Sequence, residues 1–146
     1  MRRVLVLLML CTLVLTACGG TTADTTVADP PKSSAFEKSG NAQIDAIVAG
    51  WQAQVPAELV SNAIKQESIE EKVYQTTASL QEISDYYHQL TDASKGWTEV
   101  TRMPGLQDGF YLRGYDHGNV SLVVGAFDAS KVGGQGVVVY TAKGTK

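Results

Sequence analysis

The feature that most constrains the fold is a helix start signal at residue 79, followed by a regular apolar stripe. Ser79 and Glu82 form a capping box, in which the hydroxyl accepts from the backbone at residue 82 and the carboxylate reaches back. Apolar side chains then recur at intervals of three and four: Leu80, Ile83, Tyr87 and Leu90, with Tyr86 widening the stripe. Lys95 and Gly96 are typical of a helix C-terminus. This spacing predicts a helix over residues 80–94 with one buried face.

Strand patterns surround this helix on both sides. Two precede it, at residues 63–68 and 69–76, and four follow it, at residues 97–103, 110–115, 120–127 and 137–140. Pro104-Gly105 closes the first of the four, and the polar residues 116–119 form a turn between the next two. The pattern predicts an α+β domain: an antiparallel sheet of about five to six strands with one central helix packed on one face.

A second helix is expected nearer the N-terminus. Ile44, Ile47, Val48 and Trp51 lie at positions i, i+3, i+4 and i+7. Asn41 is a suitable N-cap, and Pro56 should stop the element, which predicts a helix over about residues 42–54. The pattern leaves open whether this helix packs on the domain or extends from it.

The first 18 residues have the layout of a bacterial secretory signal. Arg2 and Arg3 are followed by a stretch of 12 residues, 4–15, that is almost wholly apolar. A spanning helix needs about 20 apolar residues, and the run stops short of that at Gly19-Gly20. A transmembrane anchor is therefore the weaker interpretation.

The end of this segment resembles the lipobox of bacterial lipoproteins. Leu15-Thr16-Ala17-Cys18 has the Leu, two small residues and Cys of that family. The resemblance implies a signal peptide over residues 1–17, cleavage before Cys18 and a diacylglyceryl group on the Cys18 thiol. It also implies a lipid-anchored protein in the cell membrane or outer membrane, facing the extracytoplasmic side. Two or more acyl chains hold a protein firmly on a membrane.

Cleavage at this site would leave an acidic domain without free thiols. Cys11 would be discarded and Cys18 alkylated, so neither a disulfide nor a cysteine-based metal site is expected. Loss of Arg2 and Arg3 changes the net charge from −3 to −5, with 10 basic against 15 acidic side chains. A chain of this charge, with no basic cluster, is not expected to bind nucleic acid.

Residues 18–43 are expected to be a lipidated N-terminus and a flexible linker. From Gly19 onward Thr, Ala, Ser, Gly, Pro and Asp dominate, and Phe36 is the one aromatic residue. Such a composition cannot bury enough apolar surface to offset its ordering entropy. About 25 flexible residues would reach roughly 25–30 Å, with the small α+β domain following at residues 44–146.

The order of elements in residues 57–142 is similar to that of small extracytoplasmic lipoprotein domains of unassigned function. The shared features are a strand ending in Gln75-Thr76-Thr77, a helix with Tyr86-Tyr87, and Gly96-Trp97 opening several strands. This resemblance implies an architecture only and supplies no catalytic residues.

The sequence contains no recognisable catalytic, cofactor or metal motif. His88 and His117 are the two histidines, beside Asp85 and Asp116, and neither has the spacing of a metal-binding pair. No Gly-x-Ser-x-Gly elbow occurs, and the glycine-rich residues 133–136 precede a strand and cannot cradle phosphate as a helix start does. We therefore predict no catalytic residues, no cofactor and no metal.

The candidate ligand face is a row of side chains on one expected strand. Tyr111, Arg113 and Tyr115 alternate onto the same face, and they could form a binding platform if that face is open. We expect a membrane-anchored lipoprotein displaying a non-enzymatic binding or structural domain, whose protein or small-molecule partner the sequence does not identify.

Two alternatives stay open. A lipid-tethered hydrolase would need His88, His117 and a carboxylate to converge in one pocket. An accessory subunit of a membrane complex would need a contiguous exposed apolar patch.

Overall fold

A computed structural model of the protein describes residues 24–146. These residues form an α+β fold with a six-stranded antiparallel sheet in the order β1-β2-β6-β5-β4-β3. The elements are β1 Ser33–Ala35, α1 Ala42–Ser61, β2 Glu70–Thr76, α2 Leu80–His88, β3 Thr98–Gln107, β4 Phe110–His117, β5 Val120–Asp128 and β6 Val137–Thr145. The predicted fold class and antiparallel sheet are confirmed. The expected signal peptide and lipidation site lie outside the described residues.

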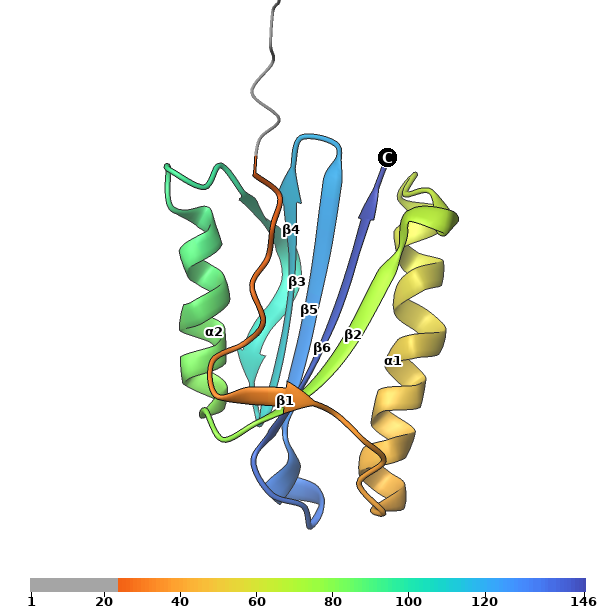
Figure 1. Ribbon diagram of the computed structural model, residues 1–146, viewed down its shortest axis with the longest axis vertical. Helices are drawn as coiled ribbons and strands as arrows, with labels where there is room; N and C mark the ends of the chain where they lie inside the picture. The colour runs from red at the N-terminus through yellow and green to blue at the C-terminus, as the bar shows by residue number, and fades with distance from the viewer. Residues whose placement is uncertain (1–23) are drawn as a thin grey trace, which may run out of the picture.

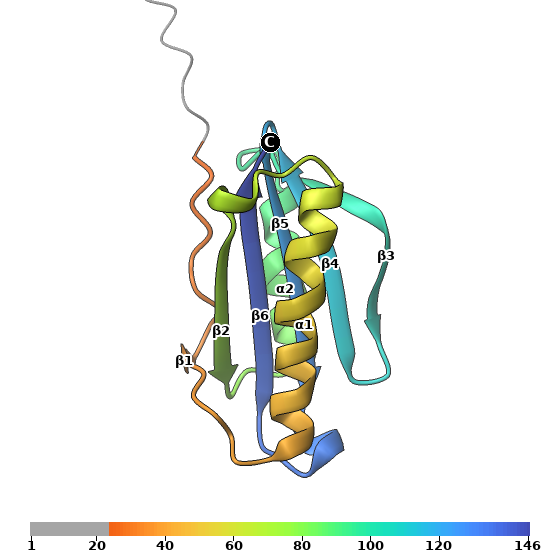
Figure 2. The ribbon, with the colours of Figure 1, turned by 90° about the vertical axis from the view of Figure 1, so that its right-hand side faces the viewer.

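The two helices lie on opposite faces of the sheet (Figures 1 and 2). On one face, Ile83 and Tyr87 of α2 are at most 1% exposed and pack in a core with Leu122 of β5. On the other, Ile44 and Val48 of α1 pack against Phe127 and its neighbours. The central strands β5 and β6 are therefore buried on both faces, which explains their nearly continuous runs of apolar residues.

Helix α1 continues past the proline that was expected to end it. Asn41 is the predicted N-cap and accepts hydrogen bonds from the backbone N–H groups of Gln43 and Ile44, but the helix ends at Ser61 and contains Pro56. A proline inside a helix removes one backbone hydrogen bond and costs about 3 kcal/mol. Leu59, only 5% exposed in the core beyond it, offsets part of that cost by burying its side chain. The expected end near residue 54 was wrong.

Helix α2 begins as predicted and ends earlier. The Ser79 hydroxyl accepts from the Glu82 N–H, and the Glu82 carboxylate accepts from the Ser79 N–H at 2.7 Å. That backbone hydrogen bond, with Lys32 beside it, lowers the pKa of Glu82 to about 2. The α-helix stops at His88, and a 3-10 turn over Gln89–Thr91 replaces the last turn expected up to residue 94.

The hairpin between β3 and β4 turns later than expected. Asp108 and Gly109 both have positive φ, which matches a type I′ hairpin turn, and Gln107 pairs with Phe110. Strand β3 therefore passes through Pro104 and ends at Gln107, with a bulge between Val100 and Gly105. Pro104-Gly105, which was expected to end the strand, lies at this bulge instead.

Two other expected strands differ from the structure: one is absent and one is longer. Residues 63–68 form no strand: Ala63 has a positive φ, and a 3-10 turn occupies Gln66–Ser68. The final strand, expected to stop at residue 140, runs on to Thr145 because its whole length pairs with β5.

The segment expected to be a flexible linker contributes to the fold from Asp24 onward. Strand β1 pairs with β2 at one edge of the sheet. Before it, residues 24–31, which we call the strap, run alongside α2 toward β1 (Figure 1). Side-chain hydrogen bonds hold the strap: Tyr74 donates to the Asp29 carboxylate at 2.5 Å, Thr76 to the Pro31 carbonyl at 2.6 Å, and Tyr86 to the Asp29 carbonyl at 3.1 Å. Lys72 also forms an ion pair of 3.6 Å with Asp29. These contacts are polar, so no apolar pattern in the sequence indicates them.

Candidate functional site

The predicted ligand face is closed, because α2 covers it. Tyr111 and Tyr115 are 2% and 1% exposed, belong to the core beneath α2, and share a hydrogen bond of 2.6 Å between their hydroxyl groups. Burial raises the pKa of both tyrosines, and their mutual hydrogen bond raises that of Tyr111 further. These two side chains stabilise the core and do not form an open platform.

Arg113, the third residue of that face, holds the bulge of β3 in place. Its guanidinium makes an ion pair with Glu99 at 2.8 Å and donates to the Met103 carbonyl inside the bulge. Gly105 has φ +74° at this point, and any Cβ there would collide with the guanidinium. The internal partners of Arg113 explain its position without a ligand.

The two histidines do not share a site. His88 Nδ1 lies 3.3 Å from a Glu99 carboxylate oxygen on the exposed side of α2. His117, at the end of β4, packs its ring against Trp97 with centroids 5.4 Å apart. The convergence that a hydrolase site required is therefore not found for this pair.

The exposed large hydrophobic side chains come from separate elements. Val60 is on α1, Leu106 on β3 and Phe110 on β4, with exposures of 41%, 38% and 44%. Phe110 stacks on the buried Phe127 at 6.0 Å, so part of its ring completes the core.

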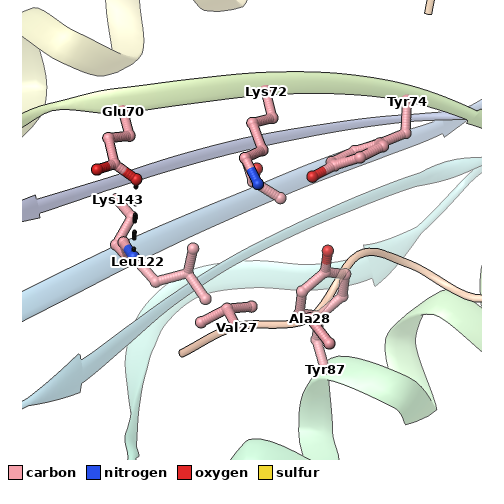
Figure 3. A pocket seen from close by; sticks show the side chains of 9 residues that line it. Val27, Ala28, Glu70, Lys72, Tyr74, Tyr87, Leu122 and Lys143 are labelled. Atoms are coloured by element: carbon pink, nitrogen blue, oxygen red, sulfur yellow. Dashed lines mark ion pairs between the residues drawn. The ribbon is translucent and has the colours of Figure 1, made fainter. Parts of the chain in front are cut away.

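A small cavity lies between the strap and the sheet (Figure 3). It measures about 40 Å³, enough for one or two water molecules, and lies between Val27 of the strap and Leu122 of β5. Lys143 and Glu70 form an ion pair of 3.7 Å along its rim. Its size excludes an organic ligand.

A larger hollow lies on the other side of the strap, and we call it the strap pocket. It measures about 480 Å³, within the usual range for small-molecule sites. Its lining comes from the strap, the end of α2, the loop before β3 and the end of β4: Asp24, Thr26, Val27, Ala28, Tyr86, Leu90, Ser94, Lys95, Trp97 and His117. These segments meet at the end of the molecule where the chain enters the fold (Figure 1).

Packing fixes the aromatic wall of the strap pocket. Trp97 is 4% exposed and belongs to the core beneath α2. His117 lies against its ring and also against Gly96, where a Cβ would come within 2.9 Å of the imidazole Nε2. Gly96 has φ +70°, so a glycine both adopts this backbone conformation and leaves room for the imidazole. The sequence pattern places Gly96 at a helix end and Trp97 in a strand, and it contains no signal for their role in this wall.

The strap forms the remaining wall, and its attachment can be tested. Replacing Tyr74 with Phe removes the hydrogen bond to the Asp29 carboxylate. Because hydrogen bonds to charged groups contribute about 1.5–3 kcal/mol, we expect the free energy of unfolding to fall by that order. We also expect faster amide hydrogen exchange in residues 24–31. Tyr140→Phe is the matched control, since it removes a similar hydrogen bond, to Glu71 at 2.5 Å, away from the strap. Equal exchange of the strap in both variants would contradict its attachment through Tyr74.

Comparison with known proteins found no matching family model, no matching curated protein and no matching solved structure. Within residues 24–146, no group of three or more His, Cys, Asp or Glu side chains is placed to hold a metal ion. In the same part of the chain, no helix combines the length and apolar character needed to cross a membrane.

Proposed function

We propose that this chain is a bacterial lipoprotein, anchored through a lipid on Cys18 in the cell membrane or outer membrane. Its domain would bind a ligand on the extracytoplasmic side without catalysing a reaction. The main support for a lipid anchor is the motif Leu15-Thr16-Ala17-Cys18, which directly follows a basic start and a short apolar run. The acidic charge of the remaining chain means that the anchor would depend on the lipid and not on attraction between the domain and an anionic membrane surface.

The strap limits how far from the membrane such a domain could lie. Only residues 19–23 separate Cys18 from the strap, which begins at Asp24. Because an extended chain spans at most about 3.3–3.6 Å per residue, a lipid on Cys18 would hold Asp24 within roughly 20 Å of the bilayer. The strap pocket, which Asp24 lines, would then open close to the lipid headgroups.

The strap pocket also supports a binding role over catalysis. Its walls combine the apolar side chains of Val27, Leu90 and Trp97 with a few polar groups, a composition typical of small-molecule sites. Its single histidine, His117, contacts an aromatic ring and has no carboxylate partner among the described residues. A general base in a hydrolase is normally oriented by such a partner.

The anchor is tested by expressing the full chain in a bacterium and analysing the product. We expect wild-type protein in the membrane fraction, with intact mass showing a chain that starts at Cys18 and carries a diacylglyceryl group. Cys18→Ala should retain residues 1–17 and lose the lipid mass. Cys11→Ala is the matched control, since Cys11 lies within the segment to be removed, and it should behave as wild type. An unmodified Cys18 thiol in the wild-type product would overturn the proposal.

A further inference from the structure

The strap pocket has an apolar interior and a cationic side. Val27 of the strap, Leu90 after α2 and Trp97 before β3 supply its apolar walls. Leu90 is 9% and Trp97 4% exposed, so both walls are fixed parts of the core beneath α2. These two walls of the pocket are therefore in place before any ligand binds.

Two basic side chains line the same pocket without internal partners. Neither the Lys95 ammonium nor the His117 imidazole makes a hydrogen bond or ion pair within residues 24–146. His117 is nevertheless held in one place by Trp97 and Gly96. A polar ring that is positioned by packing, with its nitrogens unused, can bind a ligand without a reorganisation cost.

The acidic group of the lining is already engaged. Asp24 accepts a hydrogen bond from the Thr26 N–H at 2.9 Å, and Thr26 lowers the pKa of this carboxyl group. The Asp24 carboxylate keeps its negative charge and accepts the Thr26 N–H within the strap, whereas the Lys95 ammonium has no hydrogen-bond or ion-pair partner among the described residues. Lys95 is therefore the charged group of the lining that is free to bind an anion.

From this arrangement we infer that the strap pocket binds a single-chain amphiphile with one anionic group. The apolar chain would lie against Val27, Leu90 and Trp97, and the anionic group would face Lys95 and His117. The inference rests on the proposed binding role and names its ligand class. The lipid anchor would hold the pocket near a bilayer, where molecules of this class collect.

The probe is decanoate, below its micellar concentration, added to residues 18–146 carrying Cys18→Ser. The three hydrophobic core clusters of the described residues lie within 24–146, so this chain keeps the contacts that the structure describes. The readout is the NMR signal of the two indole N–H groups. Trp97 lines the pocket, while Trp51 packs on the opposite face of the sheet and serves as an internal control. Decanoate should shift the Trp97 signal in a saturable way and leave that of Trp51 unchanged.

Two further probes separate the apolar chain from the charge. Acetate, which has the anionic group alone, should not shift Trp97 at the same concentration. Decyltrimethylammonium, which carries the opposite charge on the same chain, should bind at least several-fold more weakly than decanoate. Equal binding of the two ten-carbon probes would overturn the assignment of an anionic ligand.

Variants locate the site. Lys95→Glu, on an exposed loop, should weaken decanoate binding by roughly fivefold to tenfold, since it reverses a charge near the ligand. Lys38→Glu makes the same change at the other end of the molecule, between β1 and α1, and should have no effect (Figure 1). Ser94→Trp, also on the exposed loop, should fill the pocket and abolish binding.

The outcomes are distinct. No saturable shift of Trp97, or parallel shifts of Trp97 and Trp51, would overturn the inference and leave the lipid anchor untouched. An unmodified Cys18 in the native product would remove the anchor and leave a decanoate site in place.

Discussion

Raising the pH above 10 is expected to unfold this domain over a narrow range. Four tyrosines are at most 2% exposed: Tyr87, Tyr111, Tyr115 and Tyr140. Burial raises the pKa of each above the ordinary value of 10.0, because a phenolate would lose its hydration inside the protein. The folded protein therefore keeps these groups protonated at a pH at which the unfolded chain releases their protons.

The sign of the effect follows from this difference. Below pH 10 the folded and the unfolded state both keep the tyrosine protons, so the stability is unaffected. Above pH 10 the unfolded state binds fewer protons than the folded state, and the free energy of unfolding therefore falls as the pH rises. Each tyrosine contributes about 1.4 kcal/mol per pH unit, and four together contribute roughly 5 kcal/mol per unit. A domain with about 5–15 kcal/mol of stability should unfold within roughly one to three units.

Circular dichroism and tyrosinate absorbance measured along one alkaline titration check this expectation. The absorbance of the buried tyrosines should appear together with the loss of structure. The double variant Tyr111→Phe/Tyr115→Phe removes a pair of hydroxyls that bond each other, so its stability at pH 7 should change little. Its unfolding midpoint should move to higher pH, since two of the four groups no longer ionise. Ionisation of all tyrosines near pH 10 in a protein that stays folded would contradict this explanation.

The sequence predicted those elements whose signals are local. The capping box at Ser79 and Glu82 and the N-cap at Asn41 need only neighbouring residues, and the structure contains both. The antiparallel sheet followed from alternation and turn residues. The prediction that Pro56 ends the helix was wrong because burial of Leu59, against residues far along the chain, offsets part of the local cost of the proline.

The candidate site was harder to predict because the hydrogen bonds that hold the strap join residues distant in sequence. Tyr74 holds Asp29 across 45 residues, and nothing in the composition of the strap indicates that pairing. Tyr111 and Tyr115 were correctly placed on one face, but only the packing of α2 decides that this face is closed. The strap pocket appears only once the strap and Trp97 are brought to the same end of the fold.

Trp51→Ala is expected to be among the most destabilising single substitutions in this domain. The Trp51 ring packs edge-on against Phe127 at 5.6 Å and against Tyr140 at 5.9 Å, and it joins two core clusters beneath α1. Removing a large aromatic side chain from such a position costs about 3–5 kcal/mol, and the half-buried ring of Trp51 places this change toward the lower value. Urea unfolding at pH 7 measures the loss, with Trp51→Phe as the milder control.

Gly125 provides a sharper test of the same contact. A Cβ on Gly125 would lie 3.3 Å from the Trp51 ring, so Gly125→Val should destabilise the wild-type protein by crowding the indole. In the Trp51→Ala background the added methyl groups would enter the space left by the ring, and valine also suits a strand better than glycine. The same substitution should therefore change from destabilising to neutral or stabilising, a coupling that a double-mutant cycle measures directly. Additive effects of the two changes would show that α1 does not pack on β5 through Trp51.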